Sequence, residues 1–203
     1  RMGTAVGAAA PNMQEFFATL PFFPPESLVK GIFVNARGER FINEDAYHGR
    51  VAHYVLRQPE GRAWLLVDNE IFGRPMLQPD IPIAAVGESW EEVEAELGLP
   101  TGALVHTVET FNREAEQGRD PLLHKAGEWL RPLAGPPFAA LGYCSGDFGA
   151  HAFTLGGLAT RPTGEVLDAD GRPIAGLYAA GRTACGLPRW GEGYSSGLSL
   201  GDS

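Results

Sequence analysis

The stretch that decides the fold is GLYAAGRTACGLPRWGEGYSSGLSLGDS, which runs from Gly176 to Ser203. It opens with Leu177 to Ala180, an apolar run that predicts a short buried strand. Gly181 follows directly, at a point where the backbone passes close to something that a side chain would block. Further on, Tyr194 to Gly197 predicts a loop that enters a helix at Leu198. Because helix starts expose unpaired N–H groups and carry partial positive charge, the stretch favours an anionic cofactor.

Short strand patterns lead up to this stretch. The runs 153–155, 158–160 and 165–167 are rich in residues that favour strands. Asp168-Ala169-Asp170-Gly171 follows as a turn, because Asp side chains bond to nearby backbone and Gly accepts unusual dihedrals. The C-terminal part of the chain is therefore expected to be β-rich.

Two segments resemble one family. The segment FTLGGLATRPTGEVLDADGRPIAGLYAAGR, followed by GYSSGLSLGDS, resembles the C-terminal end of the fumarate reductase and 3-ketosteroid dehydrogenase superfamily of FAD enzymes. GIFVNARGERFINEDAYHGR, from Gly31 to Arg50, is similar to the Arg-Phe-x-Asn-Glu segment of that superfamily. The order Tyr-x-Ser-Gly-x-Ser-Leu-Gly is most similar to the 3-keto-5α-steroid Δ4-dehydrogenase branch.

The resemblance implies an α+β chain built from an inserted cap, or substrate, domain and the C-terminal β-rich part of a Rossmann-like FAD-binding domain. We expect residues 1–24 and 151–203 in the FAD-binding domain and residues 25–150 in the cap. Family members start with a Gly-x-Gly-x-x-Gly fingerprint after a first strand, and this sequence has none. We therefore expect the N-terminal half of the FAD-binding domain to be absent from this chain, and the chain alone to be inactive.

The same resemblance assigns FAD as the cofactor and places it on two segments. The first is the end of the predicted strand, and the second is the start of the predicted helix. The residues implied to bind FAD are Ala180, Gly181, Arg182, Gly197, Leu198, Ser199 and Leu200.

Hydroxyl groups in the glycine-rich loop are the candidate catalysts. The Tyr194 hydroxyl can donate to a substrate carbonyl oxygen, and a backbone N–H near Gly197 can donate beside it. Together they would stabilise the enolate that forms when the neighbouring carbon loses a proton. Ser196 is a further candidate for the proton path, whereas a packed tyrosine with ordinary turn serines is the structural alternative.

A second candidate group follows Asn43-Glu44-Asp45. By resemblance, a tyrosine near this point accepts the proton in ketosteroid dehydrogenases, and Tyr47 stands there. A tyrosine ionises near pH 10 and so needs a partner to act as a base, while His48 is the better intrinsic base near neutral pH. The sequence leaves both open, and it also assigns substrate contacts to His48 and Gly197. We interpret Arg40, Asn43 and Glu44 as a hydrogen-bonded framework.

Composition excludes several other classes of protein. Lys and Arg number 16 against 25 Asp and Glu, and the resulting net charge of −9 argues against nucleic acid as a partner. No apolar run is long enough to span a membrane. Cys144 and Cys185 lack metal-site spacing and fit reduced thiols in the cytoplasm. His53, His106 and His124 show no paired spacing, so no metal site is expected.

Local patterns predict the remaining elements. Apolar spacing and capping residues indicate helices, and β-branched or aromatic runs indicate strands. The expected elements are a helix from near Pro11 to Leu20, a hairpin of 32–34 and 41–42, a helix over 47–58, a strand over 63–67, a helix from the capping box 89–92 to Leu97, a helix over 101–116 and a strand over 138–143.

By resemblance, the activity is desaturation of a carbon–carbon bond next to a ketone. A hydride passes to flavin N5 and a proton to the protein, with a 3-ketosteroid-like hydrophobic substrate and an unknown electron acceptor. The enzyme alternative is reduction of an unsaturated dicarboxylate, which needs clustered cations. Tyr194 stands where that branch usually has an arginine, and Arg189 is the nearby replacement. The non-enzyme alternative is an inert domain or interaction module.

Overall fold

The chain folds into two units. The computed structural model describes residues 2–20, 22–23, 25–144 and 151–198 of the 203. One unit consists of residues 1–19 and 151–203, and the other of residues 20–150. Both contain antiparallel strand pairs with helices outside the sheets, so the α+β class is confirmed.

An antiparallel sheet of four strands forms the core of the unit 20–150. Its strands are β2 (Ile32–Asn35), β3 (Ala63–Asp68), β4 (Ile83–Gly87) and β5 (Phe138–Gly142), in the order β2-β3-β5-β4. Every residue of β2, β3 and β5 is buried, while the edge strand β4 alternates between buried and exposed positions. The hydrophobic core of this unit therefore runs through β2, β3 and β5.

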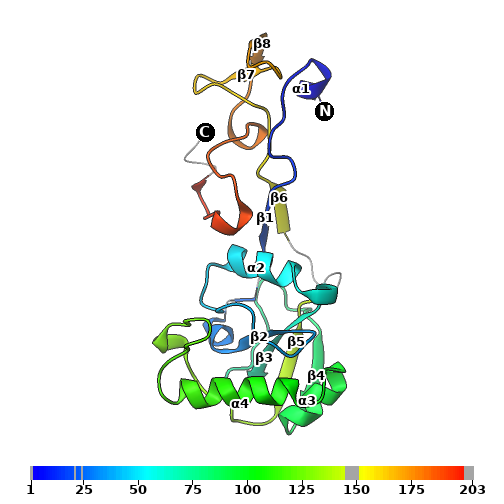
Figure 1. Ribbon diagram of the computed structural model, residues 1–203, viewed down its shortest axis with the longest axis vertical. Helices are drawn as coiled ribbons and strands as arrows, with labels where there is room; N and C mark the ends of the chain where they lie inside the picture. The colour runs from blue at the N-terminus through cyan, green and yellow to red at the C-terminus, as the bar shows by residue number, and fades with distance from the viewer. Residues whose placement is uncertain (1, 21, 24, 145–150, 199–203) are drawn as a thin grey trace. The chain divides into compact units, whose positions relative to one another are not determined.

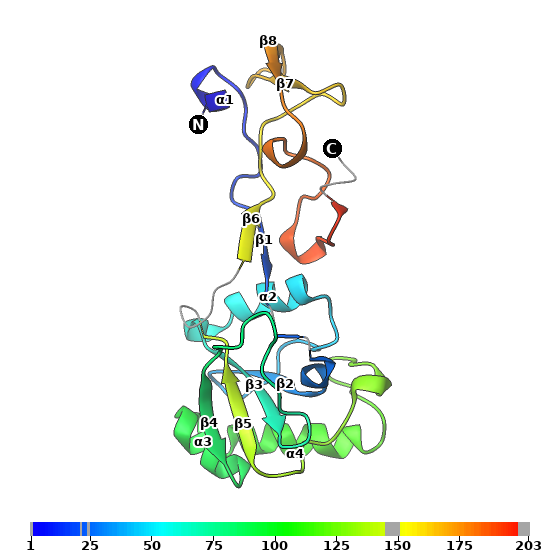
Figure 2. The ribbon, with the colours of Figure 1, turned by 180° about the vertical axis from the view of Figure 1, so that it is seen from behind.

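Helices surround this sheet. They are the 3-10 turns η1 (Glu26–Lys30), η2 (Pro59–Gly61) and η3 (Gly127–Trp129), and the α-helices α2 (His48–Leu56), α3 (Trp90–Leu97) and α4 (Ala103–Ala115). The strands lie between α2 and α4 in the front view (Figure 1) and in the view from behind (Figure 2). The helices predicted over 47–58, 89–97 and 101–116 are thus confirmed, and each observed end lies within two residues of the predicted one.

Caps explain where α3 and α4 begin and end. Ser89 Oγ accepts from the Glu92 N–H at 3.3 Å, and Gly98 closes α3 in the left-handed conformation. The expected return bond of the capping box is replaced, because Glu92 Oε2 accepts from the Glu88 N–H instead. The start of α4 is capped by Glu94, whose carboxylate accepts from Leu104 N–H at 2.8 Å. A buried carboxylate from one helix therefore satisfies the first turn of the next.

The other unit is built from two strand pairs. Its elements are α1 (Met2–Ala5), β1 (Phe16–Thr19) paired with β6 (His151–Thr154), β7 (Glu165–Leu167) paired with β8 (Pro173–Tyr178), and the 3-10 turns η4 (Gly181–Thr183) and η5 (Gly191–Gly193). The predicted turn between β7 and β8 is confirmed. Asp168 Oδ1 accepts from the N–H groups of Asp170 and Arg172 at 2.9 Å, and Gly171 has φ +78°.

The helix predicted from Pro11 to Leu20 is wrong. Asn12 has φ 61°, which no right-handed helix allows, and the following residues form strand β1. Phe17 of β1 pairs with Phe153 of β6, so a partner far along the chain selects the extended form. The apolar spacing that suggested a helix reflects contacts on a short two-stranded ladder.

The hairpin predicted after Gly31 is only half right. Asn35 Oδ1 accepts from the N–H groups of Arg37 and Glu39 and closes the turn, but only Val34 and Arg40 bridge beyond it. Strand β2 takes β3 as its partner. The ladder stops at Arg40 because its side chain turns to buried carboxylates.

Two further strand predictions need correction, and one strand was not predicted. The run from Leu177 to Ala180 is not a buried strand, because β8 ends at Tyr178 and is mostly exposed, with Tyr178 at 66%. Residues 158–160 form only isolated bridges, to Ala184 and Val166. Strand β4 was missed, because it starts directly after Pro82, which in the sequence signals a break in the apolar run 81–86.

Candidate functional site

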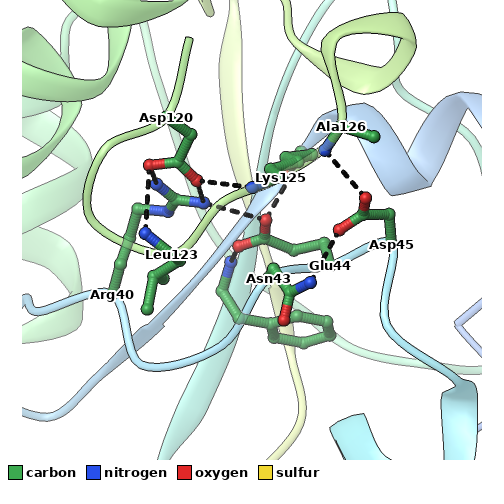
Figure 3. A network of polar contacts seen from close by, with 10 residues as sticks. Arg40, Asn43, Glu44, Asp45, Asp120, Leu123, Lys125 and Ala126 are labelled. Carbon is green, nitrogen blue, oxygen red and sulfur yellow. Dashed lines mark hydrogen bonds and ion pairs between the residues drawn. The ribbon is translucent and has the colours of Figure 1, made fainter.

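A buried cluster of four charges lies in the unit 20–150 (Figure 3). The guanidinium of Arg40 donates to both oxygens of Asp120 at 3.1 Å and to Glu44 Oε2 at 3.1 Å. Lys125 Nζ lies 3.1 Å from the same Glu44 oxygen and donates to the Gly31 carbonyl at 2.6 Å. The side chains of all four are at most 4% exposed. Two cations and two anions are thus paired without solvent.

Burial and pairing oppose each other in the pKa values of this cluster. Burial alone would lower the pKa of Arg40, but the carboxylates of Glu44 and Asp120 outweigh it and raise that pKa. Burial would raise the pKa of Asp120, yet its bonds to Arg40 hold it below its usual value. For Lys125 burial lowers the pKa, and the charge of Glu44 only partly offsets this effect. The mutual ion pairs and hydrogen bonds of these four side chains make the cluster a framework.

The segment after Arg40 is tied down at each step. Glu44 Oε1 accepts from the Phe33 N–H of β2 at 2.8 Å. Asp45 accepts from Asn43 Nδ2 at 3.0 Å and from the Ala126 N–H at 2.8 Å. The framework role expected for Arg40, Asn43 and Glu44 is therefore confirmed by the bonds they make.

Tyr47 and His48 stand together where α2 begins. Tyr47 is the N-terminal flanking residue of α2, with its carbonyl accepting from the N–H groups of Arg50 and Val51. The two rings have centroids 4.3 Å apart, and Phe23 meets the His48 ring edge-on at 6.3 Å. Burial lowers the pKa of His48. Burial therefore favours the neutral form of the imidazole, which is the form that can act as a base.

Tyr194 lies in the other unit, on an aromatic group. Its ring centroid is 4.4 Å from that of Phe17 and 5.4 Å from that of Phe153, and the residue is only 6% exposed. The ring is thus a packed part of the small core around β1 and β6. This packing holds the side chain in one orientation.

The loop after Tyr194 is exposed. Ser196, Gly197 and Leu198 are all on the surface, and Gly197 has φ +95° with no heavy atom within 4 Å of an added Cβ. Gly193 has the same open space. Ser199 and Leu200 lie outside the described residues. The loop therefore offers accessible backbone rather than a closed side-chain pocket.

The glycine turn after β8 is held by a parallel bridge between Leu158 and Ala184. Leu158 N–H donates to the Thr183 carbonyl at 2.8 Å, and Cys185 N–H donates to the Leu158 carbonyl at 2.9 Å. Gly181 has φ +60°, while Ala180 before it is extended and exposed. These bonds fix the backbone of the segment 180–185.

Arg182 is exposed but engaged within its own unit. Its guanidinium lies 4.0 Å from the centroid of the Phe153 ring and donates to the Thr154 carbonyl at 3.1 Å. The cation therefore covers the same aromatic group on which Tyr194 packs.

Sequence reasoning missed Asp120 and Lys125. Both lie in the irregular stretch between α4 and β5, and Asp120 is 80 residues from Arg40. A lone lysine in a loop gives no local signal, because ionic partners this far apart are chosen by the fold. The only clue was that Arg40 and Glu44 stand four residues apart and need further partners once buried.

Comparison with known proteins identifies the family. The FAD binding domain family matches residues 7–198, so the chain belongs to this family and FAD is its cofactor. The resemblance found in the sequence is confirmed. Among the described residues, none of the helices has the length and apolar character needed to cross a membrane.

The relatives are dehydrogenases and reductases by name, the latter including a probable fumarate reductase of Shewanella frigidimarina that is 28% identical over 78% of this chain and 27% of its own length. The 3-ketosteroid-delta4-(5alpha)-dehydrogenase from Rhodococcus jostii RHA1, solved with 4-androstene-3,17-dione, is 40% identical with a TM-score of 0.84, covering 99% of this chain and 41% of that one. The 4-oxocyclohexanecarboxylate 2-dehydrogenase of Sinomonas cyclohexanicum is 32% identical over 84% of this chain and 35% of its own length. The 3-oxo-5-alpha-steroid 4-dehydrogenase of Comamonas testosteroni is 28% identical over 89% of this chain and 38% of its own. The chain thus spans well under half of each relative.

The described residues fit part of an FAD site, through glycine backbone that a ligand can approach and through exposed apolar surface. The glycine segments at 181 and 197 expose backbone with positive φ, where a ligand can approach closely. Leu187 and Trp190, each 71% exposed, add apolar surface in the same unit. An exposed apolar surface of this kind is typical of a face that another group covers.

Proposed function

We propose that this chain is part of an FAD-dependent dehydrogenase that makes a carbon–carbon double bond next to a ketone. In this proposal residues 25–150 are the inserted cap, and residues 1–24 and 151–203 belong to the FAD-binding domain. The single observation that supports it most is the likeness, over 99% of the chain, to a 3-ketosteroid dehydrogenase solved with a steroid ketone.

The FAD would be held by the backbone of the two glycine segments. Ala180, Gly181 and Arg182 form the first, and Gly197 to Leu200 the second. When bound, FAD supplies an acceptor for the hydride that leaves the substrate. The exposed side chains of Leu187 and Trp190 would be covered by the cofactor or by further parts of the FAD-binding domain.

Tyr194 is proposed to polarise the substrate carbonyl. Its hydroxyl donates to the carbonyl oxygen, with the Gly197 N–H as a second donor, so that negative charge can develop on that oxygen. The ring packing against Phe17 and Phe153 supports this role, because it holds the donor in place before the substrate arrives. Ser196, exposed beside it, would extend the proton path.

The Tyr47–His48 pair is proposed to take the proton from the carbon next to the carbonyl. The neutral imidazole of His48 can accept it directly, or through Tyr47, whose hydroxyl needs a base partner at neutral pH. The same histidine would contact the substrate. The proposed substrate is a bulky hydrophobic ketone of the 3-ketosteroid type.

The test is Tyr194→Phe in the full-length enzyme. We expect kcat on a saturated 3-ketosteroid, followed by the absorbance of the conjugated ketone product, to fall by about 10² to 10³, the effect of losing one donor to an oxyanion. FAD content should not change, because the ring stays. Tyr54→Phe, the same deletion on α2, is the matched control and should keep full activity.

Two results would change the proposal. Full activity of Tyr194→Phe on the ketone would exclude the polarising role. Activity restricted to unsaturated dicarboxylates and abolished by Arg189→Ala would instead favour a reductase. In this structure the Arg189 guanidinium donates a hydrogen bond to Cys185 Sγ at 3.2 Å. Comparing Tyr47→Phe with His48→Gln then separates the two candidate bases.

A further inference from the structure

We infer that the loop Asp120–Ala126 is an element that positions Tyr47 and His48 for proton transfer. The inference rests on the proposed function. Its residues would be positioning residues, acting through Arg40, Glu44 and Asp45.

The loop grips the preceding segment at three points in succession. Asp120 holds Arg40 through two bonds of 3.1 Å, Lys125 holds Glu44 at 3.1 Å, and the Ala126 N–H holds Asp45 at 2.8 Å. Figure 3 shows the loop facing the segment that carries Arg40 to Asp45, with these contacts between them. Because Arg40, Glu44 and Asp45 are all bonded to the loop, the segment between them has little freedom to move relative to it.

Both the loop and the segment are also bonded to the sheet. Lys125 Nζ donates to the Gly31 carbonyl at 2.6 Å, and Glu44 Oε1 accepts from the Phe33 N–H at 2.8 Å. Both backbone groups flank or belong to β2, which is buried along its whole length. The loop and the segment are therefore fixed to the same rigid element, not merely to each other.

Little chain remains between the grip and the reactive pair. The last held residue is Asp45, and Ala46 donates its N–H back to the Asn43 carbonyl at 3.1 Å, which closes a turn. Tyr47 follows and starts α2. The position of residue 45 therefore helps to set where Tyr47 enters α2, together with the buried face of the helix itself.

Energetics favour a positioning role over a purely stabilising one. A buried ion-pair network is often no more stable than well-packed apolar residues of the same volume, because desolvation offsets the Coulomb attraction. The charged hydrogen bonds instead add directionality, because each of them restricts how the loop and the segment can lie relative to each other. Proton transfer is sensitive to such geometry, since a misplacement of about 1 Å can cost on the order of 10² in rate.

The deciding variant is Ala126→Pro. Ala126 is exposed and has φ −66°, which a proline ring accepts, so the substitution deletes the N–H that holds Asp45 without burying or exposing a charge. Ala126→Ser keeps the N–H and is the matched control. Lys125→Met removes the central cation, and Arg131→Met, which loses pairs to Asp68 and Glu70 elsewhere in the unit, is its control.

The first readout needs no flavin and no substrate. In the 203-residue chain, carbon-13 NMR signals of the Tyr47 ring and the His48 imidazole should shift or double in Ala126→Pro and in Lys125→Met, and stay in place in both controls. Unchanged ring signals in a folded Ala126→Pro protein would overturn the inference. If Lys125→Met fails to fold, Ala126→Pro alone decides.

The second readout uses the full-length enzyme on a saturated 3-ketosteroid. We expect Ala126→Pro to lower kcat by about tenfold to a hundredfold with KM nearly unchanged, and Ala126→Ser to restore kcat. An unchanged kcat together with moved signals would also overturn the positioning role. If the parent enzyme does not act on ketones at all while the NMR signals move, the proposed function fails and the geometric dependence of the pair on the loop stands.

Discussion

The unit 20–150 and the unit 1–19 with 151–203 use similar strand-forming sequences with opposite results. In the first, every residue of β3 and β5 is buried. In the second, β8 has only half-buried and exposed positions. The difference shows that a strand pattern indicates an extended backbone, whereas burial depends on whether other layers of the same unit cover the strand.

The charges follow the same contrast. The unit 20–150 pairs Arg40 and Lys125 with carboxylates at nearly zero exposure. In the other unit, the pair between Arg172 and Asp170 is 73% and 65% exposed. Buried pairs cost much to break, because the remaining charge is left without water, while exposed pairs contribute little. The buried cluster and the exposed pairs should therefore respond very differently to equivalent substitutions.

The largest expected difference is in hydrogen exchange. Amides of β3, in the centre of its sheet, should exchange at least about 10³ times more slowly than those of β8, because opening β3 requires unfolding of the unit whereas β8 opens locally. Hydrogen–deuterium exchange with mass spectrometry on the chain measures this ratio. Equal protection of the two strands would remove the contrast.

Removing a member of the buried cluster should come next. Glu44→Ala leaves Arg40 and Lys125 without their shared carboxylate, so the free energy of unfolding of that unit should fall by about 3–5 kcal/mol. Urea denaturation followed by tryptophan fluorescence measures it. Glu60→Ala, which breaks an exposed pair with Arg62, is the control and should cost less than about 1 kcal/mol. Similar losses for both would show that the cluster is not buried.

The cap of α3 should give a smaller effect. Ser89→Ala removes the acceptor for the Glu92 N–H, and the free energy of unfolding should fall by about 1 kcal/mol. Thr101→Ala, an exposed residue just before α4, should change it by no more than about 0.5 kcal/mol. A Ser89→Ala protein as stable as the Thr101→Ala protein would argue against the cap.

The smallest expected effect concerns pH. Burial lowers the pKa of His48 in the folded chain, so the unfolded chain binds a proton first as the pH falls below about 6.5. Stability should therefore decrease through that window and level off below the folded pKa. His48→Gln should lack this part of the pH dependence in urea titrations between pH 7.5 and 5.5. An identical pH profile would mean that the histidine titrates alike in both states.

The sequence by itself determined the features that depend on near neighbours. Helix α3 with its Ser89 cap, the apolar spacing of α4, strand β3 and the Asp168–Gly171 turn are all predictable, because these signals span only a few residues. It also determined the family, through the two segments that carry the resemblance. Of the candidate site, it correctly marked Arg40 and Glu44 as a framework.

Only the tertiary structure decided what depends on distant partners. Residues 16–19 form a strand rather than a helix because β6 pairs with them from the far end of the chain. Arg40 and Glu44 find Asp120 and Lys125 because the fold brings the loop there, and no local pattern encodes a partner 80 residues away. The sequence likewise could not predict that β8 is exposed. An apolar run shows that a strand can be buried, but the packing of other elements decides whether it is.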